Sequence, residues 1–120
     1  MQKLTETDVK RQIKDCLKSI GARVVSFPGS GFGENGVADQ LVCLKGEFIA
    51  IEVKRPGWKP PGRNTKAYKH YWDQKMFLES IVAAGGIGFF ATSLEEVVER
   101  LDLQVELYPL FYSEENHGKL

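Results

Sequence analysis

The sequence predicts an α/β fold, a mixed β-sheet flanked by helices in the order α-β-β-β-α-β-α. Three segments carry apolar residues at helical spacing, four shorter apolar runs are typical of strands, and the two central runs are apolar on both faces. A sheet with two apolar faces is expected to have helices on each side. Because 120 residues fit one domain, we expect the domain over residues 1–103 and an extension over 104–120.

The first helix is expected over residues 6–20. Thr5 is a good N-cap, and Asp8 three residues later resembles the second half of a capping box. Gly21 is expected to end the helix. The residues of its apolar face are Val9, Ile13, Cys16, Leu17 and Ile20. A strand over residues 22–27 and a glycine-rich loop follow.

Residues 39–44 and 48–53 are predicted to form a hairpin that turns at Lys45 and Gly46. Its apolar residues are Leu41, Cys43, Phe48 and Ala50 on one face and Val42, Leu44, Ile49 and Ile51 on the other. The remaining elements are a loop over 55–69, a helix over 70–84, a strand over 87–91 and a helix from the cap Ser93 to about Leu101. Residues 104–120 are expected to form either a further strand, which could serve dimerisation, or a frayed tail.

The composition excludes some classes of protein. The formal net charge is zero, so bulk charge identifies no partner. No apolar run approaches the roughly 18 residues of a membrane span, and the N-terminus lacks the apolar stretch of a signal peptide. We therefore expect a cytoplasmic protein without a membrane partner. Cys16 and Cys43 each lie in an apolar pattern and are interpreted as reduced core residues.

The main functional signal is the group Asp39, Glu52 and Lys54. If Leu44 pairs with Glu47 across the two-residue turn, Asp39 faces Glu52 at the open end of the hairpin. Lys54 is two residues beyond Glu52 and projects from the same face. The alternative is that Asp39 only begins a strand, and that Glu52 and Lys54 form an ordinary surface ion pair. The end of a doubly buried strand disfavours it, because charges there need partners.

These residue types suit metal-dependent phosphodiester hydrolysis. Mg²⁺ prefers oxygen ligands, which Asp39 and Glu52 would supply. The ion would stabilise charge on a scissile phosphate and help to generate hydroxide from water. Lys54 would orient the water or neutralise the phosphate. Glu6, on the inward face of the first helix, adds a third acid, unless it only stabilises the helix dipole.

The same residues resemble the VRR-NUC branch of the PD-(D/E)xK nuclease superfamily. The matching segments are Glu6, Gly36-Val37-Ala38-Asp39, Ile51-Glu52-Val53-Lys54 and Gln74, within residues 4–101. Ala38 stands where the family usually has proline, which leaves the acid in place.

The resemblance implies a restriction-endonuclease-like core with a defined site. Asp39, Glu52, Glu6 and the backbone carbonyl of Val53 would bind Mg²⁺ or Mn²⁺, Lys54 would be catalytic, and Glu6 and Gln74 would complete the site. Stand-alone viral and bacterial members are similar to Holliday-junction resolvases. The resemblance therefore also implies a homodimer and a DNA substrate, with preference for branched, junction or flap structures.

The charge distribution places a nucleic-acid surface after Lys54. Lys54 to Lys75 contains seven Lys or Arg and one acid, whereas Ser93 to Leu120 contains seven acids and two cations. Aromatic residues alternate with the cations and could stack on bases, although Trp72 is assigned to the core. The expected DNA contacts are Arg55, Lys59, Arg63, Lys66, Lys69 and His70. The alternatives to a nuclease are a non-catalytic nucleic-acid-binding module with this fold and a protein-interaction subunit that uses the acidic C-terminal segment.

Overall fold

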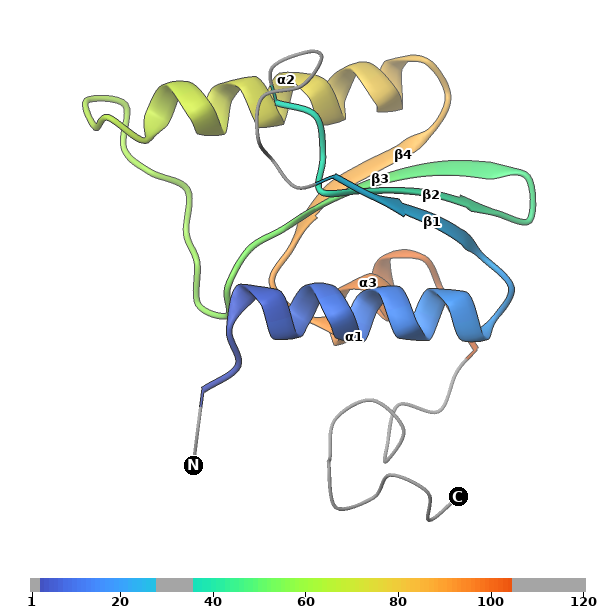
Figure 1. Cartoon of the computed structure of the whole chain (residues 1–120). Coiled ribbons are helices and arrows are strands. Elements are labelled where there is room, and N and C mark those ends of the chain that lie inside the picture. The colour runs from blue at the N-terminus through green and yellow to red at the C-terminus, as the bar shows by residue number, and fades with distance from the viewer. Residues whose placement is uncertain (1–2, 28–35, 105–120) are drawn as a thin grey trace.

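The computed structural model describes residues 3–27 and 36–104 of the chain. Their secondary structure follows the predicted order, shown in Figure 1. The elements are α1 (Glu6–Ser19), β1 (Arg23–Ser26), β2 (Gln40–Leu44), β3 (Glu47–Val53), α2 (Tyr68–Ala83), β4 (Ile87–Ala91) and α3 (Leu94–Arg100). The predicted caps are also confirmed: Thr5 and Asp8 form a capping box at α1, and the Ser93 side chain accepts a hydrogen bond at α3.

The four strands form one mixed sheet in the order β1-β2-β3-β4. The first three strands are antiparallel to their neighbours, whereas β4 runs parallel to β3. A parallel pair needs a crossover connection, and α2 supplies it. Helix α2 covers one face of the sheet, while α1 and α3 cover the other (Figure 1). The predicted α/β class with helices on both faces is therefore confirmed.

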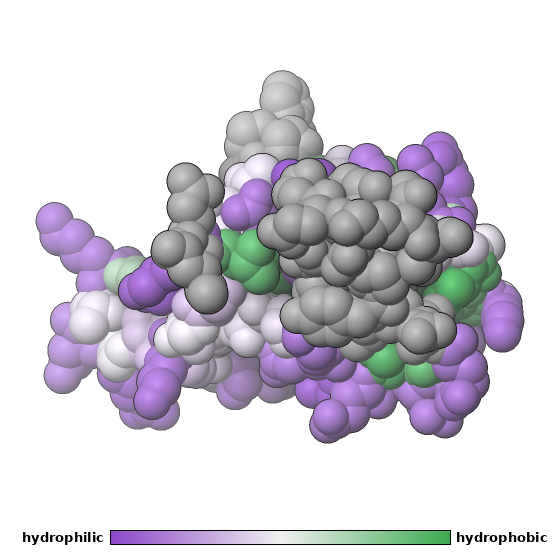
Figure 2. Space-filling view, turned by 90° about the horizontal axis from the view of Figure 1, so that it is seen from below, coloured by the Kyte–Doolittle hydropathy of each residue, from purple (hydrophilic) through white to green (hydrophobic). Residues whose placement is uncertain are grey.

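Two groups of apolar side chains hold these layers together. The larger core lies between the sheet and the α1 and α3 layer, and its fully buried residues include Ile13, Leu17, Ile49, Ile51 and Leu94. The smaller core joins the sheet to α2 through Ala38, Ala50 and Leu78. From the side of α1 and α3, most of the visible described surface is hydrophilic (Figure 2). The buried residues of α1 and α3 belong to the core shared with the strands, so the apolar faces of these helices are turned towards the sheet.

Two of the predicted core positions are wrong. Cys43 is exposed, and its hairpin partner Phe48 is 45% exposed. The turn end of the hairpin projects beyond α2 (Figure 1), so nothing from that helix covers this pair. Trp72 is 39% exposed rather than buried. It lies two residues from the buried Gln74, about 200° around the helix, and therefore on the outer face of α2.

Two further expectations concern the C-terminal extension and membrane spans. Residues 105–120, which form most of the expected C-terminal extension, lie outside the described part of the chain. Within the described part, no helix combines the length and apolarity required to cross a bilayer.

Candidate active site

The hairpin register brings two carboxylates together. Leu44 pairs with Glu47 and Gln40 with Ile51, so the predicted register is confirmed. Lys45 and Gly46 both have positive φ angles, 51° and 82°, as a tight two-residue hairpin turn requires. Asp39 directly precedes β2, so the same register places it opposite Glu52.

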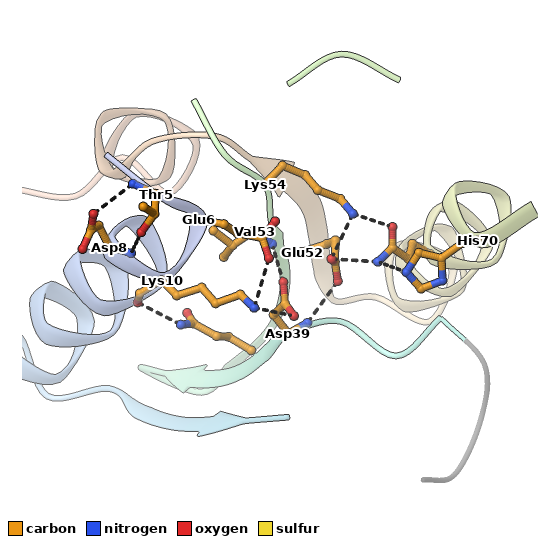
Figure 3. A network of polar contacts seen from close by, with 11 residues as sticks. Thr5, Glu6, Asp8, Lys10, Asp39, Glu52, Val53, Lys54 and His70 are labelled. Carbon is orange, nitrogen blue, oxygen red and sulfur yellow. Dashed lines mark hydrogen bonds and ion pairs between the residues drawn. The ribbon is translucent and has the colours of Figure 1, made fainter. Parts of the chain in front are cut away.

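Asp39 and Glu52 are joined through the backbone. The Asp39 amide donates to Glu52 Oε1 over 3.2 Å, and the Val53 amide donates to Asp39 Oδ2 over 3.0 Å. Figure 3 shows both carboxylates between the helices α1 and α2. Each carboxylate is therefore held by a backbone amide at or next to the other residue.

Burial and mutual repulsion disfavour the charged form of this pair of carboxylates. Asp39 is 9% exposed and Glu52 only 4%. Burial is the main cause that raises the pKa of Glu52 to about 8, and the Asp39 carboxylate adds to it. The nearby Lys54 ammonium lowers this pKa, but by less. A cation between the two carboxylates would relieve both their repulsion and part of the cost of burial.

Lys54 is held beside Glu52 from several directions. Its ammonium lies 3.4 Å from Glu52 Oε2 and donates to Gln74 Oε1 over 2.9 Å. The Gln74 amide in turn donates to Glu52 Oε2 over 2.8 Å, and its nitrogen lies 3.2 Å from His70 Nε2. The Trp58 ring lies on another side of the ammonium, with its centroid 5.4 Å away. The structure thus brings Gln74 to the pair from α2.

Lys10 enters this site although the sequence reasoning did not select it. Its ammonium lies 3.2 Å from Asp39 Oδ1 and 3.3 Å from Glu6 Oε2, so Glu6 reaches Asp39 through Lys10 (Figure 3). Burial lowers the pKa of Lys10, but Asp39 and Glu6 outweigh it and raise the pKa above its ordinary value. The spacing of Glu6 and Lys10 by one helical turn was the signal in the sequence that could have identified Lys10 as a partner of Glu6.

Gly36 fixes the approach of the chain to Asp39. Its φ is +79°, and a Cβ atom there would lie 2.3 Å from the Asp73 carbonyl oxygen. The backbone before Asp39 therefore passes directly against α2, next to Gln74. Only glycine permits both this φ and this contact.

The donor atoms at the pair suit a hard divalent cation. Within residues 3–27 and 36–104, no three His, Cys, Asp or Glu side chains are grouped as a metal site. Asp39 and Glu52 supply two carboxylates, and Val53, which follows Glu52 on β3, would add its backbone carbonyl. Mg²⁺ is commonly held by one or two carboxylates, with waters and substrate phosphates as the other ligands. The residues present therefore fit Mg²⁺ or Mn²⁺.

The basic loop leaves the site directly from Lys54. All six of the residues expected to contact DNA are exposed, namely Arg55, Lys59, Arg63, Lys66, Lys69 and His70. Trp58 anchors the loop, since its ring stacks on Phe90 and contacts Tyr71. His70 is the member of the group that also touches the site, through Gln74.

Comparison with known proteins gives a match at the level of structure. Neither the family models nor the curated proteins that were searched match this sequence. Among solved structures, the chain is similar to a VRR_NUC domain, with a TM-score of 0.60 and 22% sequence identity. The match covers 85% of this chain and 100% of the other. The chain therefore has the fold of a VRR_NUC domain.

Proposed function

We propose that this protein is a metal-dependent endonuclease of the VRR-NUC type that hydrolyses phosphodiester bonds in DNA. The observation that carries the proposal is the buried pair of Asp39 and Glu52 with Lys54 beside it. Burial, and then the Asp39 carboxylate, raise the pKa of Glu52 strongly, and perturbed pKa values of this kind cluster at functional sites. The position of the pair on a VRR_NUC fold supports a nuclease site.

Asp39, Glu52 and the Val53 carbonyl would hold Mg²⁺ or Mn²⁺ in this proposal. When bound, the ion would stabilise the charge that develops on the phosphate and lower the pKa of a coordinated water. The positive charge of the ion would then stabilise the ionised form of both carboxylates at neutral pH.

Lys54 is the proposed catalytic cation. Gln74 accepts one of its hydrogen bonds, and Glu52 attracts its charge, so its ammonium group has a fixed position. From there it would donate a hydrogen bond to the attacking water or to a phosphate oxygen. Gln74 acts as a positioning residue, because it orients both Lys54 and Glu52.

Lys10 and Glu6 serve the Asp39 side of the site. Lys10 neutralises Asp39 Oδ1, the carboxylate oxygen that faces α1, and Glu6 holds Lys10 there. In this arrangement Glu6 contributes through Lys10. A direct contact of Glu6 with the metal, expected from the sequence, stays a prediction.

The basic loop is the proposed substrate surface. Its exposed cations would contact phosphates on either side of the bond that is cut. We extend the proposal to a preference for branched, junction or flap DNA and to a homodimer. A sedimentation experiment would test the homodimer separately from activity.

A cleavage assay tests the proposed function. Purified protein in excess is incubated with plasmid, a four-way junction and flap substrates, with Mg²⁺, with Mn²⁺ or with a chelator. We expect metal-dependent cleavage that Lys54→Ala abolishes and that Lys45→Ala, an exposed lysine at the far end of the hairpin, leaves intact. Metal-independent binding without any cleavage would instead indicate a non-catalytic nucleic-acid-binding module.

A further inference from the structure

A hollow lies beside the first turns of α2, on the outer face of the helix. Its volume is about 550 Å³, which is within the range of small-molecule sites. The lining residues are Arg63, Asn64, Thr65, Tyr68, Lys69 and Trp72. None of them belongs to the group around Asp39 and Glu52.

The wall opposite the helix is a well-defined turn. The Thr65 amide and hydroxyl both donate to the Gly62 carbonyl, over 3.1 Å and 2.8 Å. The Tyr68 amide then donates to the Thr65 carbonyl over 3.2 Å. These hydrogen bonds hold the end of the basic loop against the start of α2, so the hollow is a formed feature of the fold.

Two aromatic rings form the helical side of the hollow. Tyr68 and Trp72 are one turn apart, with ring planes 26° from parallel and centroids 6.0 Å apart. Trp72 is 39% exposed even though Lys75 lies over its ring at 5.2 Å. A scattered apolar residue on a surface needs no explanation. Here, however, two adjacent rings line a hollow together with cations.

The charge and polarity of the hollow define its ligand. Arg63 and Lys69 carry positive charge, and Lys69 also forms an ion pair with Asp73. Asn64 and Thr65 add groups that can donate and accept hydrogen bonds. A flat aromatic ligand with a phosphate on its flank, that is, a nucleotide, satisfies all of these groups. A base inside a duplex has both faces covered by its neighbours, so the nucleotide must be unpaired.

We infer that this hollow binds one unpaired nucleotide of the substrate, with its base on Tyr68 and Trp72 and its phosphates near Arg63 and Lys69. The inference rests on the proposed function and narrows its substrate to DNA with a single-stranded segment. The loop that leaves Lys54 runs to the start of α2 (Figure 1). Its last residues and the first residues of α2 line the hollow, so a strand that follows the loop from the site reaches it.

A binding assay in a chelator tests this inference without cleavage. The probes are a fluorescent oligothymidylate of about 12 nucleotides and a duplex of the same length. Trp72→Ala is expected to weaken binding of the single strand about 5- to 100-fold and of the duplex less than about twofold. Trp72→Phe should retain most of the affinity. Phe48→Ala, at another exposed aromatic residue, should behave as wild type.

The outcomes separate this inference from the proposed nuclease function. Equal weakening of both probes, or unchanged binding of the single strand by Trp72→Ala, overturns the nucleotide site even if the protein cleaves DNA. Selective loss of single-strand binding supports the site even if no DNA is cleaved with any metal. Arg63→Ala provides a second test, since it should weaken single-strand binding without removing a ring.

Discussion

The Lys10 ammonium lies 3.2 Å from Asp39 Oδ1 and so joins the first helix to the carboxylate pair. Its raised pKa keeps it charged over the physiological range. A divalent cation at Asp39 would therefore bind next to a fixed positive charge. The two cations repel each other, which ties the affinity for the metal to the presence of Lys10.

Lys10→Gln should tighten metal binding. Removal of this partly exposed charge near Asp39 should make the binding of Mn²⁺ more favourable by about 1 kcal/mol, which is roughly a fivefold lower Kd. Isothermal titration with Mn²⁺ measures this, and Lys14→Gln, one turn further along α1, is the control. An unchanged or weaker affinity in Lys10→Gln would show that the ammonium does not oppose the metal.

Stability of the metal-free protein should fall as pH rises through the range set by Glu52. The folded protein raises this pKa from 4.5 to about 8, so between these values the folded state binds more protons than the unfolded state. The free energy of unfolding must then decrease with pH, by on the order of 5 kcal/mol in total, and the full loss is present above about pH 8.

Chemical denaturation in a chelator at several pH values checks this decrease. Glu52→Gln removes the titrating group, and its stability should depend much less on pH across the same range. Parallel pH profiles for the two proteins would be incompatible with a raised Glu52 pKa.

Gln74→Met should lower the cleavage rate without preventing folding. The variant loses the amide that holds both Lys54 and Glu52, and a poorly placed catalytic group can lose about 10- to 100-fold in rate. Steady-state kinetics should show the loss in kcat, with KM changed by less than about twofold. A change in KM alone would mean that Gln74 contributes to substrate binding and does not position Lys54.

Gly36→Ala should destabilise the protein more than Gly46→Ala. Both glycines have positive φ, +79° and +82°, so alanine causes similar backbone strain, about 1 kcal/mol. A Cβ atom at Gly46 meets nothing within 4 Å, whereas at Gly36 it collides with the Asp73 carbonyl. Unfolding by denaturant compares the two, and equal losses would exclude a close approach of Gly36 to α2.

The hairpin could be predicted because its information is local. Lys45 and Gly46 define the turn, and the register then places Asp39 opposite Glu52 without any distant contact. Lys10 could not be selected in the same way. Its partner Asp39 belongs to another element, and a lysine one turn from Glu6 is an ordinary surface pattern until α1 is packed on the sheet.

The errors at Cys43 and Trp72 have a similar cause. An alternating pattern shows which face of a strand Cys43 occupies, but the length of α2 decides whether that face is covered. Tyr71 and Trp72 are adjacent aromatic residues, and only one of them can face the sheet. The position of Gln74, which binds Glu52, fixes the rotation of α2 and leaves Trp72 outside.

The central claim is that Asp39 and Glu52 bind the ion that cleavage requires. The most direct measurement is Mn²⁺ binding and Mn²⁺-dependent DNA cleavage by Glu52→Gln, compared with Glu47→Gln at the exposed start of the same strand. We predict that Glu52→Gln folds but loses both metal binding and cleavage, while Glu47→Gln keeps both. Normal metal-dependent cleavage by Glu52→Gln would contradict the account.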